Sequence, residues 1–407
     1  MKRIFCLILA LMMILPVLVA CNSNGNGNDT TAPSTTEAPG ITETPGTTEI
    51  PGTTETPGTS AAPVTTTPPA DTTPPENKYE LRTFKIKENL DSIKVIGRSS
   101  PSKSVVTMDW SGSGIEFNAD FEGFLEAKMY TTVDCNIAVY IDGVAVQECM
   151  KIREGTNTYT LATGIAAGVH NVRIIKLHAA EVGRPLLTSI NTVTFKGVLD
   201  EKPADKKYLV EFIGDSITCG YGAKSKDDST TYAHLTYAYL FCQKNDYDYS
   251  FVAVSGIGTI KSGERHGSLL MGDIYPYVSY YRDQTEKYEP ERQADMVVIA
   301  LNTNDNGRVT DADKNTYKNK VRSLLADVKR IHGDDVKIVW YYGMMGSGKC
   351  DNWMKEVLEE LGGKNAGYYS FQAKPDTSGA SSHPSAAGHI ENAERLDKYI
   401  DTYKVLG

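Results

Sequence analysis

The pattern of apolar residues changes after Glu201-Lys202-Pro203, and this change decides which folds the chain can adopt. Beyond it, short apolar segments alternate with amphipathic helices up to the end of the chain. The expected strands are Tyr208–Ile213, Phe251–Val254, Met296–Leu301, Lys337–Tyr342 and Tyr368–Phe371. One expected helix carries Tyr317, Val321, Leu324, Leu325, Val328 and Ile331 on a single face, and another begins near Ser385. Such alternation predicts a parallel sheet with helices on both faces, a three-layer α/β/α domain over residues 205–407.

Residues 78–200 follow a β-like pattern instead. Segments such as Leu125 to Tyr130, Ile137 to Ile141 and His170 to Leu177 alternate or run apolar. Turn signals separate them, among them Asp142-Gly143 and Glu154-Gly155. Short strands at this spacing predict an all-β sandwich.

The N-terminus carries a targeting signal. Lys2 and Arg3 precede an apolar run from Ile4 to Ala20, which is typical of a signal peptide over residues 1–20. The run ends in Leu18-Val19-Ala20-Cys21, which resembles a bacterial lipobox, so we expect Cys21 to be lipidated. The alternative is an ordinary signal peptide followed by a chance cysteine. The lipobox reading predicts an exported protein, anchored by lipid to the outer face of a bacterial cell membrane.

Residues 21–77 form a Thr- and Pro-rich segment with almost nothing to bury. It contains three tandem hexapeptides, ITETPG (41–46), TTEIPG (47–52) and TTETPG (53–58). Such a segment cannot offset its ordering entropy by apolar burial, so we expect a disordered, extended tether.

Charge and cysteine usage exclude several partners. The net charge is −9 and no Lys/Arg cluster follows the first few residues, so nucleic acid is not expected as a partner. Five cysteines remain after Cys21, scattered and without metal-ligand spacing, so no metal is expected. At most one disulfide is conceivable, between Cys135 and Cys149.

The chemistry-bearing residues follow strands of the α/β domain. Gly214-Asp215-Ser216 comes directly after the first strand, where a nucleophile would lie at the sheet edge that binds ligands. A serine hydroxyl needs a base within hydrogen-bond reach, and His383-Pro384 opens the last helix. Ser255-Gly256-Ile257-Gly258 and Asn302-Thr303-Asn304-Asp305 follow two further strands and offer donors for an oxyanion hole.

This order of motifs resembles the SGNH, or GDSL-like, hydrolase family. The resemblance implies Ser216 as nucleophile and first oxyanion donor, and Gly258 (or Gly256) as second donor. It implies Asn304 as third donor and His383 as general base. Asp215 and Asp305 are expected to brace loops rather than react.

A closer resemblance is to carbohydrate esterase family 2. It rests on Val210–Gly222 around the nucleophile, and in the β segment on Ile93–Arg98, Trp110–Phe117, Tyr140–Gly143 and Gly168–His170. It implies a jelly-roll module packed on the SGNH domain, no metal or cofactor, and deacetylation of plant polysaccharides such as xylan and glucomannan. An esterase acting on lipids or on the cell's own acetylated wall polymers is the alternative within the same class.

Three positions depart from these families. Ala380 stands where SGNH enzymes usually carry the Asp that orients the histidine. The resemblance to family 2 esterases, some of which orient the histidine through a backbone carbonyl, implies a Ser-His dyad here. The alternative is Asp376 as a substitute carboxylate. The departure also motivates a rival function, a carbohydrate-binding surface lipoprotein with weak or no catalysis. Asn302 replaces the usual Gly and could narrow the oxyanion loop. Lys176-Leu177-His178…Glu181 replaces a Lys-Arg-Thr-Glu stretch, which puts the role of that stretch in doubt.

Aromatic residues and one decoy complete the candidates. Trp340, Tyr275 and Tyr277 are candidate sugar platforms, whereas Trp110 is expected in the β-domain core. The run Gly343–Cys350 nearly matches a phosphate-binding P-loop, but Cys350 replaces the hydroxyl that would bind Mg²⁺, so no nucleotide is expected. His389 is expected to have a packing or surface role.

Overall fold

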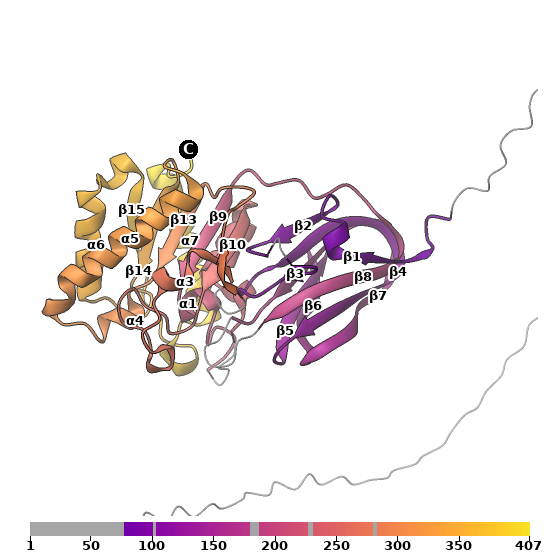
Figure 1. Cartoon of the computed structure of the whole chain (residues 1–407), viewed down its shortest axis with the longest axis horizontal. Helices are drawn as coiled ribbons and strands as arrows, with labels where there is room; N and C mark the ends of the chain where they lie inside the picture. Colours follow the sequence, from indigo (N-terminus) through magenta and orange to yellow (C-terminus); the bar gives the residue numbers. More distant parts are fainter. Residues whose placement is uncertain (1–76, 101–102, 180–186, 227–230, 280–282) are drawn as a thin grey trace, which may run out of the picture. The chain divides into compact units, whose positions relative to one another are not determined.

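The computed structural model describes residues 77–100, 103–179, 187–226, 231–279 and 283–407 (Figure 1). The expected signal peptide, Cys21 and nearly all of the tether lie outside the described residues. Among the described residues, no helix has both the length and the apolar character needed to cross a membrane.

The first part of the described chain is an antiparallel β module. Its pairing order is β1-β8-β4-β7-β5-β6, with β2 added on β4 and β3 on β8. The strands are β1 (Leu81–Lys85), β2 (Ile93–Ile96), β3 (Val106–Thr107), β4 (Gly114–Thr131), β5 (Cys135–Ile141), β6 (Val144–Ile152), β7 (Gly155–Lys176) and β8 (Thr188–Leu199). The predicted β pattern of this segment is therefore observed, whereas the division into two jelly-roll sheets stays a prediction.

Alternation along the long strands builds the module's core. In β4 the buried residues Ile115, Phe117, Ala119 and Phe121 alternate with half-buried ones, so one face of the strand turns inward. Cys135 on β5 and Cys149 on β6 are free thiols, so the conceivable disulfide is not formed.

The second part is an α/β domain around a five-stranded parallel sheet of order β10-β9-β13-β14-β15. Its strands are β9 (Leu209–Gly214), β10 (Asp248–Ala253), β13 (Met296–Ala300), β14 (Lys337–Tyr342) and β15 (Tyr368–Gln372), and a hairpin of β11 (Tyr277–Ser279) and β12 (Asp283–Lys287) stands apart. Its helices are α1 (Ser216–Cys219), α2 (Tyr237–Asn245), α3 (Met271–Ile274), α4 (Thr303–Asn306), α5 (Lys314–His332), α6 (Lys349–Glu360) and α7 (Ala386–Tyr403). The predicted parallel sheet is confirmed, and the hairpin was not predicted.

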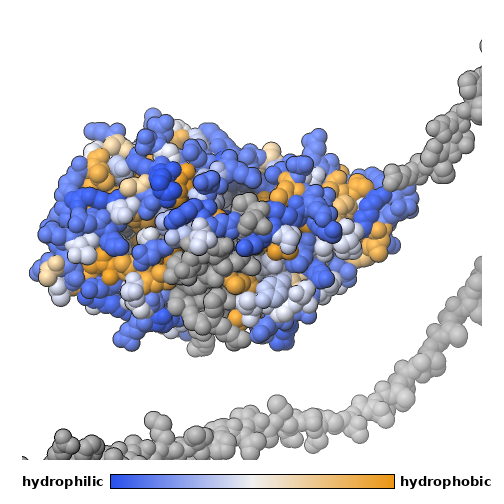
Figure 2. All heavy atoms as spheres, in the orientation of Figure 1, coloured by the Kyte–Doolittle hydropathy of each residue, from blue (hydrophilic) through white to orange (hydrophobic). Residues whose placement is uncertain are grey.

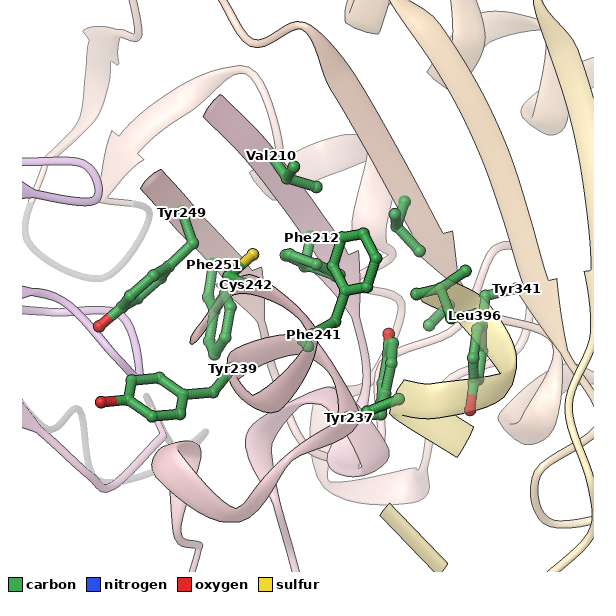
Figure 3. Close-up of a cluster of buried hydrophobic side chains, with 14 of the residues drawn as sticks. Val210, Phe212, Tyr237, Tyr239, Phe241, Cys242, Tyr249, Phe251, Tyr341 and Leu396 are labelled. Atoms are coloured by element: carbon green, nitrogen blue, oxygen red, sulfur yellow. The ribbon is translucent and has the colours of Figure 1, made fainter. Parts of the chain in front are cut away.

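The two faces of the sheet carry separate cores. On one face, Val210 and Phe212 of β9 pack with Tyr237 and Phe241 of α2 and Leu396 of α7 (Figure 3). The other face packs against α3, α5 and α6, and all six predicted apolar residues of α5 are buried there. Since successive strand residues point to opposite faces, Tyr341 joins the first core and Trp340 the second. Helices therefore cover both faces of the sheet, as predicted.

Buried contacts join the β module to the α/β domain. Arg98, just after β2, donates to the carboxylate of Glu211 on β9, with Nη2 3.0 Å from Oε1. Lys94 of β2 pairs with Asp248 of β10 at 2.7 Å. Trp110 donates its indole N–H to the Val278 carbonyl at 2.6 Å and packs in the core beneath α5. The prediction that Trp110 lies in the β-domain core was therefore wrong, because the residue belongs to the junction.

The face of the molecule drawn in Figure 2 is mostly polar. On the face drawn in Figure 2, blue hydrophilic side chains predominate and the orange ones form small scattered groups. The large exposed apolar side chains include Val144, Val146 and Val169 of the β module. Scattered apolar residues of this kind are normal on a folded protein.

Candidate active site

The nucleophile candidate begins a short helix at the end of a central strand. β9 ends at Gly214, Asp215 caps α1 by accepting the Ile217 N–H at 3.0 Å, and Ser216 is the first helical residue. A Cβ at Gly214 would lie 2.1 Å from Thr218 Oγ1, so this tight turn requires glycine. The turn leaves Ser216 5% exposed, with its hydroxyl at the carboxyl edge of the sheet.

His383 is in place to act on this hydroxyl. Its Nε2 lies 2.8 Å from Ser216 Oγ, and its Nδ1 lies 3.1 Å from the Ser381 carbonyl oxygen. A carbonyl can only accept, so Nδ1 carries the proton and Nε2 accepts from the serine hydroxyl. Burial lowers the pKa of His383 below 6.5, although hydrogen bonds to the Ser381 and Ala380 carbonyls oppose this shift. The imidazole is therefore held neutral and in the tautomer that a general base needs.

A left-handed turn presents the orienting carbonyl. Ser381 and Ser382 have φ of 51° and 58°, a region that costs non-glycine residues free energy. Hydrogen bonds fix the turn: Ala380 N–H donates to the Gly222 carbonyl at 3.2 Å, and Gly379 N–H donates to the His383 carbonyl at 2.8 Å. The turn thus gives His383 Nδ1 a backbone acceptor in place of a carboxylate.

Asp376, the proposed substitute carboxylate, binds elsewhere. Its oxygens accept from the amide and hydroxyl of Ser378 at 2.9 and 2.6 Å, and from those of Ser385 at 2.9 and 2.7 Å. Partial burial opposes ionisation, but these hydrogen bonds outweigh it and lower the pKa of Asp376 to about 2. Asp376 therefore ties the loop before His383 to the start of α7, and the prediction of an orienting role is not supported.

An Asp376→Asn variant distinguishes a role in tying the loop to α7 from a role in orienting His383. An amide facing four donors loses several bonds, so we expect the free energy of unfolding to fall by about 1–2 kcal/mol. We expect kcat to stay within about tenfold, whereas loss of an orienting carboxylate costs about 10⁴-fold. Urea unfolding and ester hydrolysis by the same preparation measure both, with Ser378→Ala as the milder matched variant. A thousandfold loss of kcat at unchanged stability would show that Asp376 orients His383 after all.

Two predicted oxyanion donors have other partners. The Gly258 N–H donates to Ser262 Oγ at 3.0 Å. The Asn304 amide nitrogen donates to the Ile257 carbonyl at 2.8 Å and to Asp215 Oδ2 at 3.2 Å, which uses both of its hydrogens. In this structure Gly258 and Asn304 connect the loops around Ser216, and their role as oxyanion donors stays a prediction. Within the described residues the N–H of Gly256, the alternative second donor, has no acceptor.

The acidic neighbours brace these loops, as predicted. Asp305 accepts the N–H groups of Thr259, Ile260 and Lys261 at 2.7–2.9 Å, and burial raises its pKa. Burial, with a contribution from Asp305, raises the pKa of Asp215 to about 7. Both carboxyl groups bind within the loops and neither contacts His383.

Asn302 turns away from the nucleophile. It adopts φ of 92°, which explains why glycine is usual there, and its side chain bonds to Tyr317 and Asp351. The expected narrowing of the oxyanion loop by this side chain is therefore not observed.

Two of the three predicted sugar platforms are buried. Trp340 and Tyr275 are fully buried, and the Tyr275 hydroxyl donates to Glu211 Oε1 at 2.9 Å. Tyr277 lies on β11, with Lys287 Nζ 3.8 Å from its ring centroid and its carbonyl accepting from Arg98. The predictions for Trp340 and Tyr275 are wrong because both rings are buried in the core, whereas that for Tyr277, which is half-buried, stays a prediction.

One aromatic at the site was missed. The Tyr221 ring lies 4.6 Å from the His383 ring, centroid to centroid. The sequence feature that could have identified Tyr221 is its position five residues after Ser216, between Gly220 and Gly222. Tyr221 forms one wall beside the base.

The P-loop-like run, Lys176 and His389 all form hydrogen bonds within the protein. In the P-loop-like run, the Gly348 and Cys350 N–H groups donate to Asp351 Oδ2 and Asn306 Oδ1 at 2.8 and 2.9 Å, so side chains take the donors a phosphate would need. Lys176 is buried and donates to the Asp109 carbonyl at 2.6 Å, while Glu181 lies outside the described residues. His389 is buried and accepts the Tyr237 N–H at 3.1 Å, a packing role.

No group of three or more His, Cys, Asp or Glu side chains in the described ranges is arranged to hold a metal.

Comparison with known families matches both parts of the chain. Residues 212–389 match the GDSL-like lipase/acylhydrolase family, and residues 95–200 match the carbohydrate esterase 2 N-terminal family. Ser216 and His383 both fall inside the first match.

Three relatives illustrate the similarity. The cellulase/esterase CelE of Acetivibrio thermocellus is 30% identical over 72% of this chain, which spans only 37% of that protein. The acetylxylan esterase / glucomannan deacetylase of Cellvibrio japonicus is 25% identical over 70% of this chain and 83% of its own length. A solved family two carbohydrate esterase from Clostridium thermocellum, in complex with cellohexaose, is 26% identical with a TM-score of 0.69, covering 76% of this chain and 98% of that one.

Proposed function

Since this chain belongs to carbohydrate esterase family 2, we propose that it is a serine esterase that removes acetyl groups from plant cell-wall polysaccharides. The observation that carries the proposal is the 2.8 Å contact between Ser216 Oγ and His383 Nε2, with His383 Nδ1 on the Ser381 carbonyl. A catalytic dyad needs this pairing of hydroxyl, neutral base and orienting acceptor.

The mechanism follows from these positions. Ser216 Oγ attacks the acetyl carbonyl carbon while His383 Nε2 takes the hydroxyl proton. The N–H groups of Ser216 and Gly256 stabilise the negative oxygen of the tetrahedral intermediate. His383 then gives the proton to the departing sugar oxygen, leaving an acetyl-enzyme. A water molecule, deprotonated by the same imidazole, releases acetate and restores Ser216.

Acetylated xylan and glucomannan are the proposed substrates, and a jelly-roll arrangement is proposed for the module. The substrate proposal draws on the activity named for the Cellvibrio relative and on the cellohexaose bound to the Clostridium structure. A surface location fits such insoluble substrates. We accordingly propose that the chain is exported and lipid-anchored at Cys21, with residues 22–77 as the spacer.

Acetate release tests the proposal. The full chain is incubated with acetylated xylan, acetylated glucomannan and a small aryl acetate, beside a Ser216→Ala variant of unchanged melting temperature. We expect release by the parent and none above background by the variant. Polysaccharide binding without acetate release would favour the rival function, a carbohydrate-binding surface protein. Equal release by both proteins would exclude Ser216 as the nucleophile.

A further inference from the structure

The loop after β10 begins at the strand end that carries the nucleophile. Val254 N–H donates to the Gly214 carbonyl at 3.1 Å, which joins this loop to the end of β9. Ile257 N–H donates back to the Val254 carbonyl at 3.2 Å, closing a turn in which Gly256 has φ of 86°. Ser216 follows Gly214 by two residues and Gly256 follows Val254 by two, so both segments leave the sheet from the same pair of bonded strand ends.

Two side chains hold the Ser255–Gly256 peptide from one side. The Ser255 carbonyl oxygen lies 2.7 Å from His266 Nε2 and 3.3 Å from an Arg265 guanidinium nitrogen, which also contacts Ser255 Oγ at 3.1 Å. A carbonyl can only accept, so His266 carries its proton on Nε2. A trans peptide is planar, with its N–H opposite its C=O. Fixing the Ser255 carbonyl therefore fixes the direction of the Gly256 N–H.

His266 is built into this position. It is 6% exposed, its Nδ1 has no hydrogen-bond partner within the described residues, and burial keeps its pKa below 6.5. In the described structure, the hydrogen bond that holds the His266 side chain is thus the one to the Ser255 carbonyl. A Cβ at Gly256 would lie 2.9 Å from His266 Nε2, so imidazole and backbone meet closely only because residue 256 is glycine.

We propose that His266, assisted by Arg265, is a positioning residue that aims the Gly256 N–H at the oxyanion formed on Ser216. It touches neither substrate nor reacting atoms and acts through the Ser255–Gly256 peptide. The inference rests on the proposed esterase function and extends it, since it explains why Gly256 rather than Gly258 supplies the second donor. A peptide that could rotate would lose preorganisation, which is the main source of oxyanion-hole catalysis.

A pair of substitutions at His266 tests the role. His266→Leu removes the donor, and we expect kcat on an aryl acetate to fall by about 10²-fold with KM within about twofold. His266→Gln places an amide nitrogen near the Nε2 position, and we expect it to keep kcat within about fivefold. Ser262→Ala is the matched control in the same loop, because it removes the Gly258 bond and should leave kcat near the parent value.

A boronic acid inhibitor provides a readout that a purely structural role would not move. Its tetrahedral adduct on Ser216 places an oxygen in the oxyanion hole, so its inhibition constant should rise in proportion to the loss of kcat across the variants. Arg265→Ala, at an exposed position, is the second variant if His266→Leu does not fold; we expect a several-fold loss with the same proportionality. Parent-like kcat in the folded variants, or a loss without weaker boronic acid binding, would overturn the inference alone. Absence of hydrolysis by the parent would overturn the proposed function and the inference with it.

Discussion

His383→Gln is expected to lower kcat for ester hydrolysis by about 10⁴-fold or more, the largest effect among the substitutions considered. Glutamine can hydrogen-bond to Ser216 Oγ, but it cannot accept the proton and return it to the leaving sugar oxygen. Triad enzymes that lose their base fall by this amount or more, and what remains comes from the oxyanion hole and binding. Steady-state hydrolysis of an aryl acetate, with protein freed of contaminating esterases, measures the loss.

The pH profile of the parent enzyme is the companion measurement. The base acts only when neutral, so kcat/KM falls as pH drops through the pKa of His383. Because burial lowers this pKa, we expect the acid limb to have an apparent pKa below 6.5. Retention of more than about 1% of the parent kcat by His383→Gln, or an acid limb well above 6.5, would contradict the assignment of the base.

The sequence predicts the dyad well because of where parallel strands end. Gly214-Asp215-Ser216 lies at the end of a recognisable buried strand and His383 lies just before a capped helix, so topology alone brings both to one edge. The sequence predicted that a backbone carbonyl would take the place of the missing carboxylate, but not which residue would supply it. That the carbonyl belongs to Ser381 depends on two left-handed serines, which no propensity favours.

Side-chain partners were the part that the sequence could not supply. Trp340 resembles a sugar platform at the end of its strand, but its facing residues come from α5 and α6. Gly258 and Gly256 are equivalent in the motif, and only the Ser262 and His266 bonds distinguish their amides. Such choices depend on the hydrogen bonds and packing of individual side chains, which hydrophobic periodicity does not encode.

The junction between the β module and the α/β domain contains a buried ionic network that the sequence did not reveal. Arg98 and Glu211 have side chains 0% and 1% exposed. Glu211 also accepts from the Tyr275 hydroxyl at 2.9 Å and lies 3.0 Å from His332 Nε2. Burial opposes ionisation of Glu211, but Arg98 and His332 outweigh it, so its pKa lies below 4.5. Both carboxylate oxygens of Glu211 thus face hydrogen-bond donors.

Arg98→Ala is expected to lower the free energy of unfolding by about 3–5 kcal/mol, because it leaves the Glu211 carboxylate buried without its main counter-charge. Urea unfolding measures the loss, and Arg153→Ala is the matched control, since Arg153 pairs with Asp134 on the surface and should leave the midpoint unchanged. Arg98→Met combined with Glu211→Gln should recover part of the loss, because no unpaired charge remains. A midpoint of Arg98→Ala equal to that of the control would show that the junction does not depend on this pair. Glu211 lies on the strand that ends at Gly214, so we also expect Arg98→Ala to weaken hydrolysis at Ser216 more than Arg153→Ala does.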